Sequence, residues 1–193
     1  MSLLAQMRNL LLCALGMVLL PHASADTVSP LPPRNFTSPE STLESYWALK
    51  DWSSTNHRSE QYRKAKEIHA VFLKKMAEVT TGETQRHFLN WEPLSPIQIS
   101  RKIKSKVEDS STRVTIIANV KNATPIPAKA APSASQLFMR EAGQDYKYVL
   151  EKSDMEWKIL EVWRVGPPGI PSNAYRLYVD SPTLSFPSYV FDD

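Results

Sequence analysis

The chain has 193 residues, of which 42% are hydrophobic, and it carries 23 basic and 20 acidic residues. This length suits one domain with a hydrophobic core. The near balance of charge argues against a nucleic-acid-binding protein, which would normally carry a concentrated basic surface.

The first 25 residues are typical of a cleavable secretory signal peptide. Arg8 is the only charged residue before an apolar run at 10–20, and Ala23-Ser24-Ala25 supplies small residues where a signal peptidase cuts. The alternative is a membrane anchor, but the run is about half of the roughly 20 apolar residues that a spanning helix needs. We therefore expect a periplasmic or secreted mature chain that begins near Asp26.

Removal of this segment changes the chemistry that the chain can perform. The only cysteine, Cys13, would leave with it, so the mature chain would have no thiol, disulfide or thiolate metal site. Loss of Arg8 reduces the 23 basic residues to 22 against 20 acids, a net charge of about +2.

Two helices are predicted after a proline-rich leader at 26–37. Ser38-Pro39-Glu40 is a helix start, because a hydroxyl caps free amides, proline suits the first turn, and an acid suits the positive end of the helix dipole. This helix is expected to end near Trp52, before Ser53-Ser54-Thr55-Asn56. The second helix, at about 59–79, carries an apolar stripe at spacings of three and four. The stripe consists of Tyr62, Ala65, His69, Phe72, Met76 and Val79.

From residue 97 the hydrophobic period changes to two, which predicts antiparallel strands. A first strand with one buried face (Ile97, Ile99, Ile103 and Val107) is followed by a turn at 109–111 and a returning strand at 114–120. The same alternation predicts that Lys102, Lys104 and Lys106 share a solvated outer face. A loop at 122–133 leads to a strand region at 136–152, interrupted near Gly143, and a last strand spans 157–165. The tail at 166–193 contains five prolines and is expected to have no regular structure.

Helices followed by antiparallel strands predict an α+β fold. The element order and the closing hairpin, Tyr146-Lys-Tyr-Val-Leu-Glu-Lys-Ser-Asp-Met-Glu-Trp157-Lys-Ile159, resemble the nuclear transport factor 2 and ketosteroid isomerase superfamily, in particular its exported bacterial members. The resemblance covers residues 38–165 and implies a cone, in which N-terminal helices pack on a curved antiparallel sheet around a pocket. It implies no single activity, because the superfamily includes isomerases, dehydratases and non-catalytic binding and assembly modules.

Three polar residues occupy positions where the hydrophobic period demands an apolar one. His69 lies in the stripe of the second helix, and Arg101 and Glu161 take the inward phase of the first and last strands. A buried charge needs a partner or a cavity, so these three are candidate pocket residues. We expect Arg101 and Glu161 to approach each other or His69. The alternative for each residue is that a neighbour satisfies it, that it reaches the rim, or that a bulge turns it outward.

The sequence contains no His-Glu-x-x-His, Gly-x-Ser-x-Gly or phosphate-binding glycine motif, so we expect no metal and no cofactor. The expected function is an exported, non-catalytic binding or assembly module. Its partner would be another envelope or extracellular protein or a second copy, with no nucleic acid and no stable membrane span.

Two alternatives remain from other classes. One is a small isomerase- or dehydratase-like enzyme that uses Glu161 or His69 as its base, and the other is a small-ligand carrier. A closed, aromatic-filled cone would favour assembly. An open cavity in which His69 and Glu161 converge would favour an enzyme.

Overall fold

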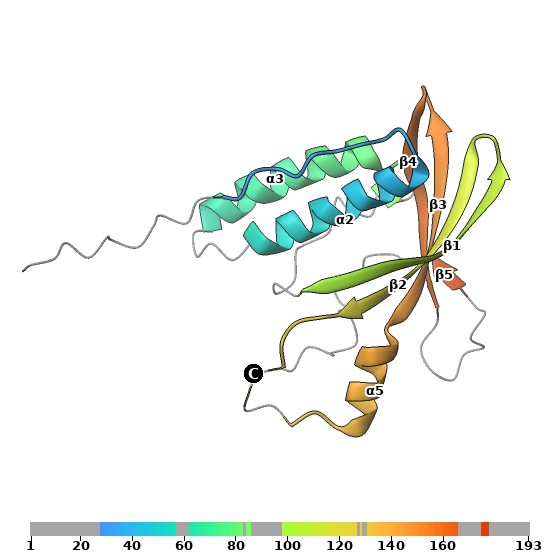
Figure 1. Cartoon of the computed structure of the whole chain (residues 1–193). Helices are drawn as coiled ribbons and strands as arrows, with labels where there is room; N and C mark the ends of the chain where they lie inside the picture. The colour runs from blue at the N-terminus through green and yellow to red at the C-terminus, as the bar shows by residue number, and fades with distance from the viewer. Residues whose placement is uncertain are drawn as a thin grey trace, which may run out of the picture.

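The computed structural model describes residues 28–56, 62–82, 84–85, 98–126, 128, 131–165 and 175–177, without the side chains of 62–65, 139, 165 and 175–177. The predicted signal segment and most of the tail lie outside these residues. Two helices lie side by side against one face of an antiparallel sheet (Figure 1). The α+β fold class predicted from the sequence is therefore confirmed. Within the described residues, no helix is both long enough and apolar enough to cross a membrane.

Helix α2 spans Pro39–Asn56 and begins as the sequence predicts. The Ser38 hydroxyl oxygen accepts a hydrogen bond from the Ser41 backbone N–H at 3.1 Å, which satisfies one of the free amides of the first turn. The predicted end near Trp52 is wrong, because the helix continues for one further turn. The Asn56 side-chain amide donates to the Trp52 carbonyl at 2.7 Å and so replaces a partner that the last turn lacks.

Helix α3 spans Tyr62–Val79 and carries the predicted apolar stripe. Phe72, Met76 and Val79 are fully buried, and they belong to the same core cluster as Ile116 of the sheet. Tyr62 and Ala65 lie among the residues whose side chains are not described. Gly82 follows the helix with a φ of 59°, a left-handed conformation that glycine adopts without strain.

The sheet is built from strands in chain order, β1-β2-β3-β4-β5, all antiparallel. Their bounds are β1 Ile99–Ser110, β2 Arg113–Asn122, β3 Gln144–Ser153, β4 Glu156–Val165 and β5 Tyr175–Leu177. The prediction that the tail has no regular structure is therefore wrong for three residues. No proline lies within β5, so its backbone amides can join the ladder with β4.

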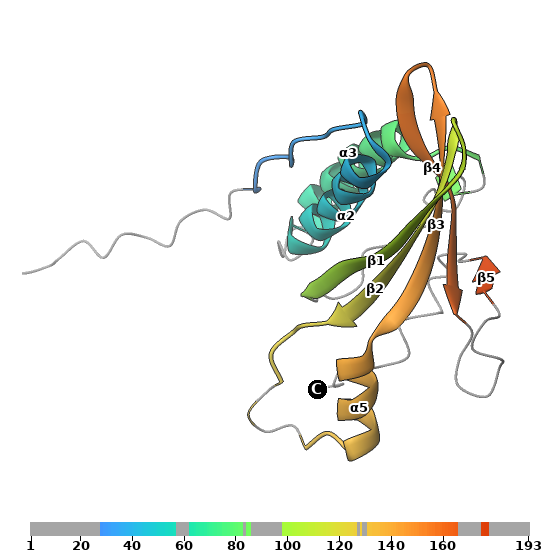
Figure 2. The same ribbon diagram turned by 45° about the vertical axis from the view of Figure 1, so that its right-hand side comes forward.

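The predicted strand region at 136–152 is also wrong in its first part. Residues Ala134–Ala142 form helix α5, which extends beyond the end of the sheet between β2 and β3 (Figures 1 and 2). Strand β3 begins only after Gly143, whose φ of 67° turns the chain from helix into strand. The Ser133 hydroxyl accepts the Gln136 backbone N–H at 3.2 Å, a helix start of the same kind as at Ser38.

A register shift divides β1 into two halves that present opposite side-chain phases. Ile103 pairs with Ala118, whereas Ser105 pairs with Ile117, so one extra residue is inserted in β1. As a result, Val107 leaves the buried face predicted for it and is 55% exposed. Lys102 and Lys104 keep the outer face, but Lys106 turns towards the helices and binds Glu40 of α2 at 2.9 Å.

The two edges of the sheet differ. Beside the first half of β4, Thr80 forms a parallel bridge with Ile159, and the Thr84 hydroxyl donates to the Leu160 carbonyl at 2.8 Å. Beside the second half of β4 lies β5. Strand β1 is the outermost strand on the other side of the described sheet.

Candidate functional site

Arg101 lies at the junction between α2 and β1. Its guanidinium donates two hydrogen bonds to the Asp51 carboxylate, at 2.7 and 2.9 Å, in the bidentate geometry that favours arginine over lysine. The Arg101 side chain is only 12% exposed, while that of Asp51 is 49% exposed. The sequence-based reasoning missed Asp51. It follows Trp47 by four residues on α2, so both lie on the same helix face, which is the one signal that could have identified it.

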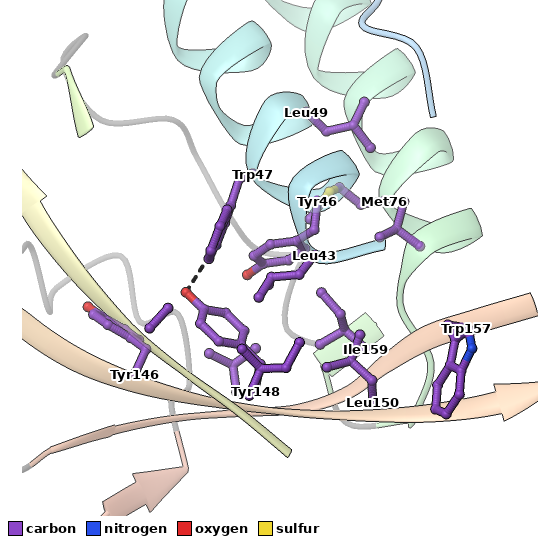
Figure 3. Close-up of a cluster of buried hydrophobic side chains, with 14 of the residues drawn as sticks. Leu43, Tyr46, Trp47, Leu49, Met76, Tyr146, Tyr148, Leu150, Trp157 and Ile159 are labelled. Carbon is purple, nitrogen blue, oxygen red and sulfur yellow. Dashed lines mark hydrogen bonds between the residues drawn. The ribbon is translucent and has the colours of Figure 1, made fainter. Parts of the chain in front are cut away.

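Aromatic side chains fill the space beneath this ion pair. The Arg101 guanidinium carbon lies 5.7 Å from the ring centre of Trp47. The Trp47 indole N–H donates to the Tyr148 hydroxyl at 3.2 Å, and the two rings meet edge to face (Figure 3). Tyr46 meets Tyr148 in the same way, and Tyr146 stacks beside it, both with ring centres 6.2 Å apart. The four rings belong to the core between α2 and the sheet.

His69 lies on α3, as predicted, and is half-buried. Its ring stacks on Phe72, with ring centres 6.4 Å apart and an angle of 24° between the planes. The histidine therefore contacts the core through the face of its ring. The structure places it on a different element from the Arg101–Asp51 pair, which is formed by α2 and β1.

Glu161 does not lie on the helix-facing side of the sheet. Leu150 pairs with Ile159 but the adjacent Val149 pairs with Glu161, so a bulge at Leu160 shifts the phase of β4. Because paired residues share a face and adjacent ones do not, Glu161 and Ile159 point to opposite sides. The expectation that Glu161 faces inward is thus wrong, and the alternative of a bulge that turns it outward is correct.

On the outer face Glu161 belongs to a small polar cluster. Its carboxylate accepts a hydrogen bond from the indole N–H of Trp163 at 2.8 Å, and the Lys147 ammonium lies 4.6 Å from the centre of that indole ring. Arg101 lies on β1, which two strands separate from β4, and it is on the other face. Arg101 and Glu161 therefore do not pair.

A second outer-face cluster, also missed from the sequence, holds α5 in place. Asp145 accepts hydrogen bonds from Lys104 at 2.6 Å and from the Asn119 amide at 2.9 Å. Burial acts to raise the pKa of Asp145, but these two hydrogen bonds outweigh it and hold the pKa below its ordinary value. The same Asn119 amide donates to the Ala142 carbonyl at 3.1 Å, at the last turn of α5.

These arrangements suit charge pairing and packing better than proton transfer. The Arg101 guanidinium offers hydrogen-bond donors and no acceptor, and the carboxylate of Asp51 is engaged by two of these donors. His69 and Glu161 lie on different elements, and Glu161 faces away from the helices. Across the part of the chain that is described, no three His, Asp or Glu side chains lie close enough together to hold a metal ion.

No family model, curated protein or solved structure matches this chain.

Proposed function

We propose that the chain is an exported, non-catalytic binding or assembly module with the cone fold of the nuclear transport factor 2-like superfamily. The order of its elements supports this assignment, since two helices precede and cover an antiparallel meander. Export rests on the signal-like first 25 residues.

The observation that carries the proposal is the filling of the space between α2 and the sheet. Trp47, Tyr46 and Tyr148 meet there with their rings in contact geometry, and all three are at most 9% exposed (Figure 3). An enzyme or carrier of this fold would need room for a ligand at this place. Side chains that occupy it favour a module that acts through its surface.

The outer surface offers apolar residues for contact. Phe138 on α5 is 71% exposed and Met155 in the β3–β4 turn is 79% exposed, although both are large and apolar. Single exposed apolar residues are common, but these two lie on elements that project from the sheet and helices (Figures 1 and 2).

The proposal is tested by identifying the complexes that the mature chain forms in the envelope of its own cells. A tagged mature chain would be extracted mildly, fractionated by size, and its complexes identified by mass spectrometry after crosslinking. We expect a complex of defined stoichiometry, either with another protein or with a second copy. Phe138→Asp or Met155→Asp should weaken the complex, whereas Lys102→Asp, which changes an exposed charge on β1, serves as the control.

Two outcomes would contradict the proposal. A monomer that carries a bound small molecule in native mass spectrometry would favour the carrier. A monomer without partner or ligand, whose turnover of an added carbonyl substrate is lost in His69→Gln, would favour the enzyme.

A further inference from the structure

The segment before α2 is attached to the helices along its length. Residues Val28–Phe36, here called the strap, run back beside α2 from its last turn to its first (Figures 1 and 2). A chain reversal at Thr37 joins the strap to α2, where the Asn35 side-chain oxygen accepts the Thr37 backbone N–H at 3.0 Å and its hydroxyl at 2.7 Å.

At its first end, the strap is bound through the backbone N–H and the backbone carbonyl of a single residue. The Ser29 backbone N–H donates to the Asn56 side-chain oxygen at 2.7 Å, and the Ser29 carbonyl accepts the Trp52 indole N–H at 2.7 Å. The Asn56 amide nitrogen is in turn fixed by the Trp52 carbonyl. These two side chains are thus oriented to receive an extended backbone, and each is at most 8% exposed beneath the strap.

At its other end, backbone atoms again make the contacts. The Asn35 backbone N–H donates to the Ser45 hydroxyl at 2.9 Å, and the Phe36 carbonyl accepts the Trp157 backbone N–H of β4 at 3.0 Å. Between the two ends, Arg34 forms an ion pair with Glu78 of α3. Phe36 packs against the core.

Apart from Arg34 and Phe36, the apolar side chains of the strap contribute little to its attachment. Val28 is 45% exposed and Leu31 is 42% exposed, although both are apolar. Between the two bound ends lie Pro30, Pro32 and Pro33, which restrict φ and favour the extended polyproline II conformation. An indole N–H that donates to a carbonyl just before a proline is the kind of contact by which proteins recognise such segments.

We infer that Ser45, Trp52 and Asn56 of α2, with Glu78 of α3, form a binding surface for extended, proline-containing peptides, which the chain's own strap occupies in cis. The inference rests on the proposed function, because it names the class of partner that such a module would bind. A partner segment with the same backbone shape would occupy the surface when the strap is displaced.

Covalent linkage favours the strap over a partner. A short link gives the strap an effective concentration in the millimolar range, so a free peptide at micromolar concentration cannot compete until the link is cut. The intrinsic affinity of the surface can therefore be measured only after the strap is separated from α2.

The experiment uses the complete mature chain with a protease site inserted between Thr37 and Ser38. After cleavage, the released strap is removed by gel filtration, and circular dichroism checks that the domain remains folded. A fluorescent peptide with the sequence of residues 26–37 is then titrated and followed by anisotropy. We expect saturable binding to the cleaved domain and none to the uncut chain at micromolar peptide.

Variants test whether the named contacts carry the binding. Asn56→Ala should weaken peptide binding about tenfold, as expected when a hydrogen bond to a buried polar group is lost. Thr55→Ala, on the exposed neighbouring position of α2, should leave the affinity unchanged. On the unaltered cleaved domain, a peptide with glycine in place of its three prolines should bind severalfold more weakly, because it loses more conformational entropy on binding.

Two results would overturn the inference. If the cleaved domain stays folded but binds the peptide no better than a scrambled one, the surface has no affinity of its own. If the domain unfolds on cleavage, the strap is part of the fold and not a bound ligand. Neither result affects the envelope complexes of the uncut chain, so failure of the proposed function would be seen separately.

Discussion

At the scale of single residues, the junction of α2 and β1 contains a guanidinium group that solvent barely reaches. Removal of Asp51 would leave Arg101 without its partner, so Asp51→Asn should cost about 1–2 kcal/mol. The coupling between the two residues should be smaller, about 1 kcal/mol, because the half-exposed carboxylate is screened by water. Urea unfolding of Arg101→Met, Asp51→Asn and the double variant would measure both quantities. Additive losses would show that the two side chains do not interact.

Two glycines with positive φ provide a matched pair. A Cβ at Gly143 would lie 2.7 Å from the Val120 carbonyl oxygen, whereas one at Gly82 would meet the mobile end of the Leu160 side chain at 3.0 Å. We expect Gly143→Ala to cost about 2–3 kcal/mol, from left-handed strain and a backbone clash, and Gly82→Ala to cost only about 1 kcal/mol, from strain alone. Denaturant titration of the two variants checks this. Equal losses would mean that the approach at Gly143 is not tight.

At the scale of elements, the β3–β4 turn has a geometry that Met155 does not favour. Asp154 and Met155 have φ values of 51° and 70°, so both central positions of this two-residue turn are left-handed. Asn-Gly is the sequence preferred there. Replacement of both residues by Asn-Gly should raise the free energy of unfolding by about 1 kcal/mol. Met155→Ala serves as the control and should change stability little, since alanine is also strained. A destabilised Asn-Gly variant would show that the methionine side chain contributes to folding.

The elements that the sequence predicted correctly are those in which burial and periodicity agree. Strand β2 alternates strictly, with Val114, Ile116, Ala118 and Val120 buried. The errors occur where a single inserted residue or a tertiary contact determines the local structure. Nothing local in β4 marks the bulge at Leu160 that turns Glu161 outward. Likewise, the last turn of α2 exists because Asn56 binds both that turn and a distant strap residue.

Helix α5 shows a different limit. It has only nine residues, and its apolar residues follow neither the helical nor the strand period clearly, so the sequence is ambiguous between helix and strand.

Of the candidate site, the sequence identified Arg101 as a buried charge that needs a partner. It could not identify Asp51, because the pairing of α2 with β1 depends on how the helices cross the sheet.

At the scale of the whole molecule, ion pairs between elements make stability depend on pH. The hydrogen bond from Lys106 lowers the pKa of Glu40, and at Asp145 the bonds from Lys104 and Asn119 outweigh burial and lower its pKa as well. A carboxyl whose pKa is lower in the folded state stabilises the fold above its unfolded pKa and loses that contribution as the pH falls. Stability should therefore decline from about pH 5 towards pH 3.

At the basic end the sign is reversed. The hydrogen bond to Glu40 raises the pKa of Lys106, so the contribution of Lys106 to stability is complete below the unfolded pKa and is lost as the pH rises through the folded value.

Urea unfolding from pH 3 to 7 would test the predicted loss of stability in acid, and Asp145→Asn should make that loss smaller. An unchanged slope in that variant would show that other carboxyls dominate.

The irregular outer strand β1 limits how copies of the chain can aggregate. A straight, uncharged outer strand is a template on which another chain can add a strand of its own. In β1 two register shifts interrupt the regular backbone pairing of the strand. Lys102 and Lys104 also place positive charge beside the backbone to which an added strand would have to bind. On the opposite side, Thr80 and β5 already pair with β4. Open-ended growth into fibrils by edge-to-edge pairing is thus obstructed at both sides of the described sheet. This protection matters wherever many copies of the chain fold beside one another.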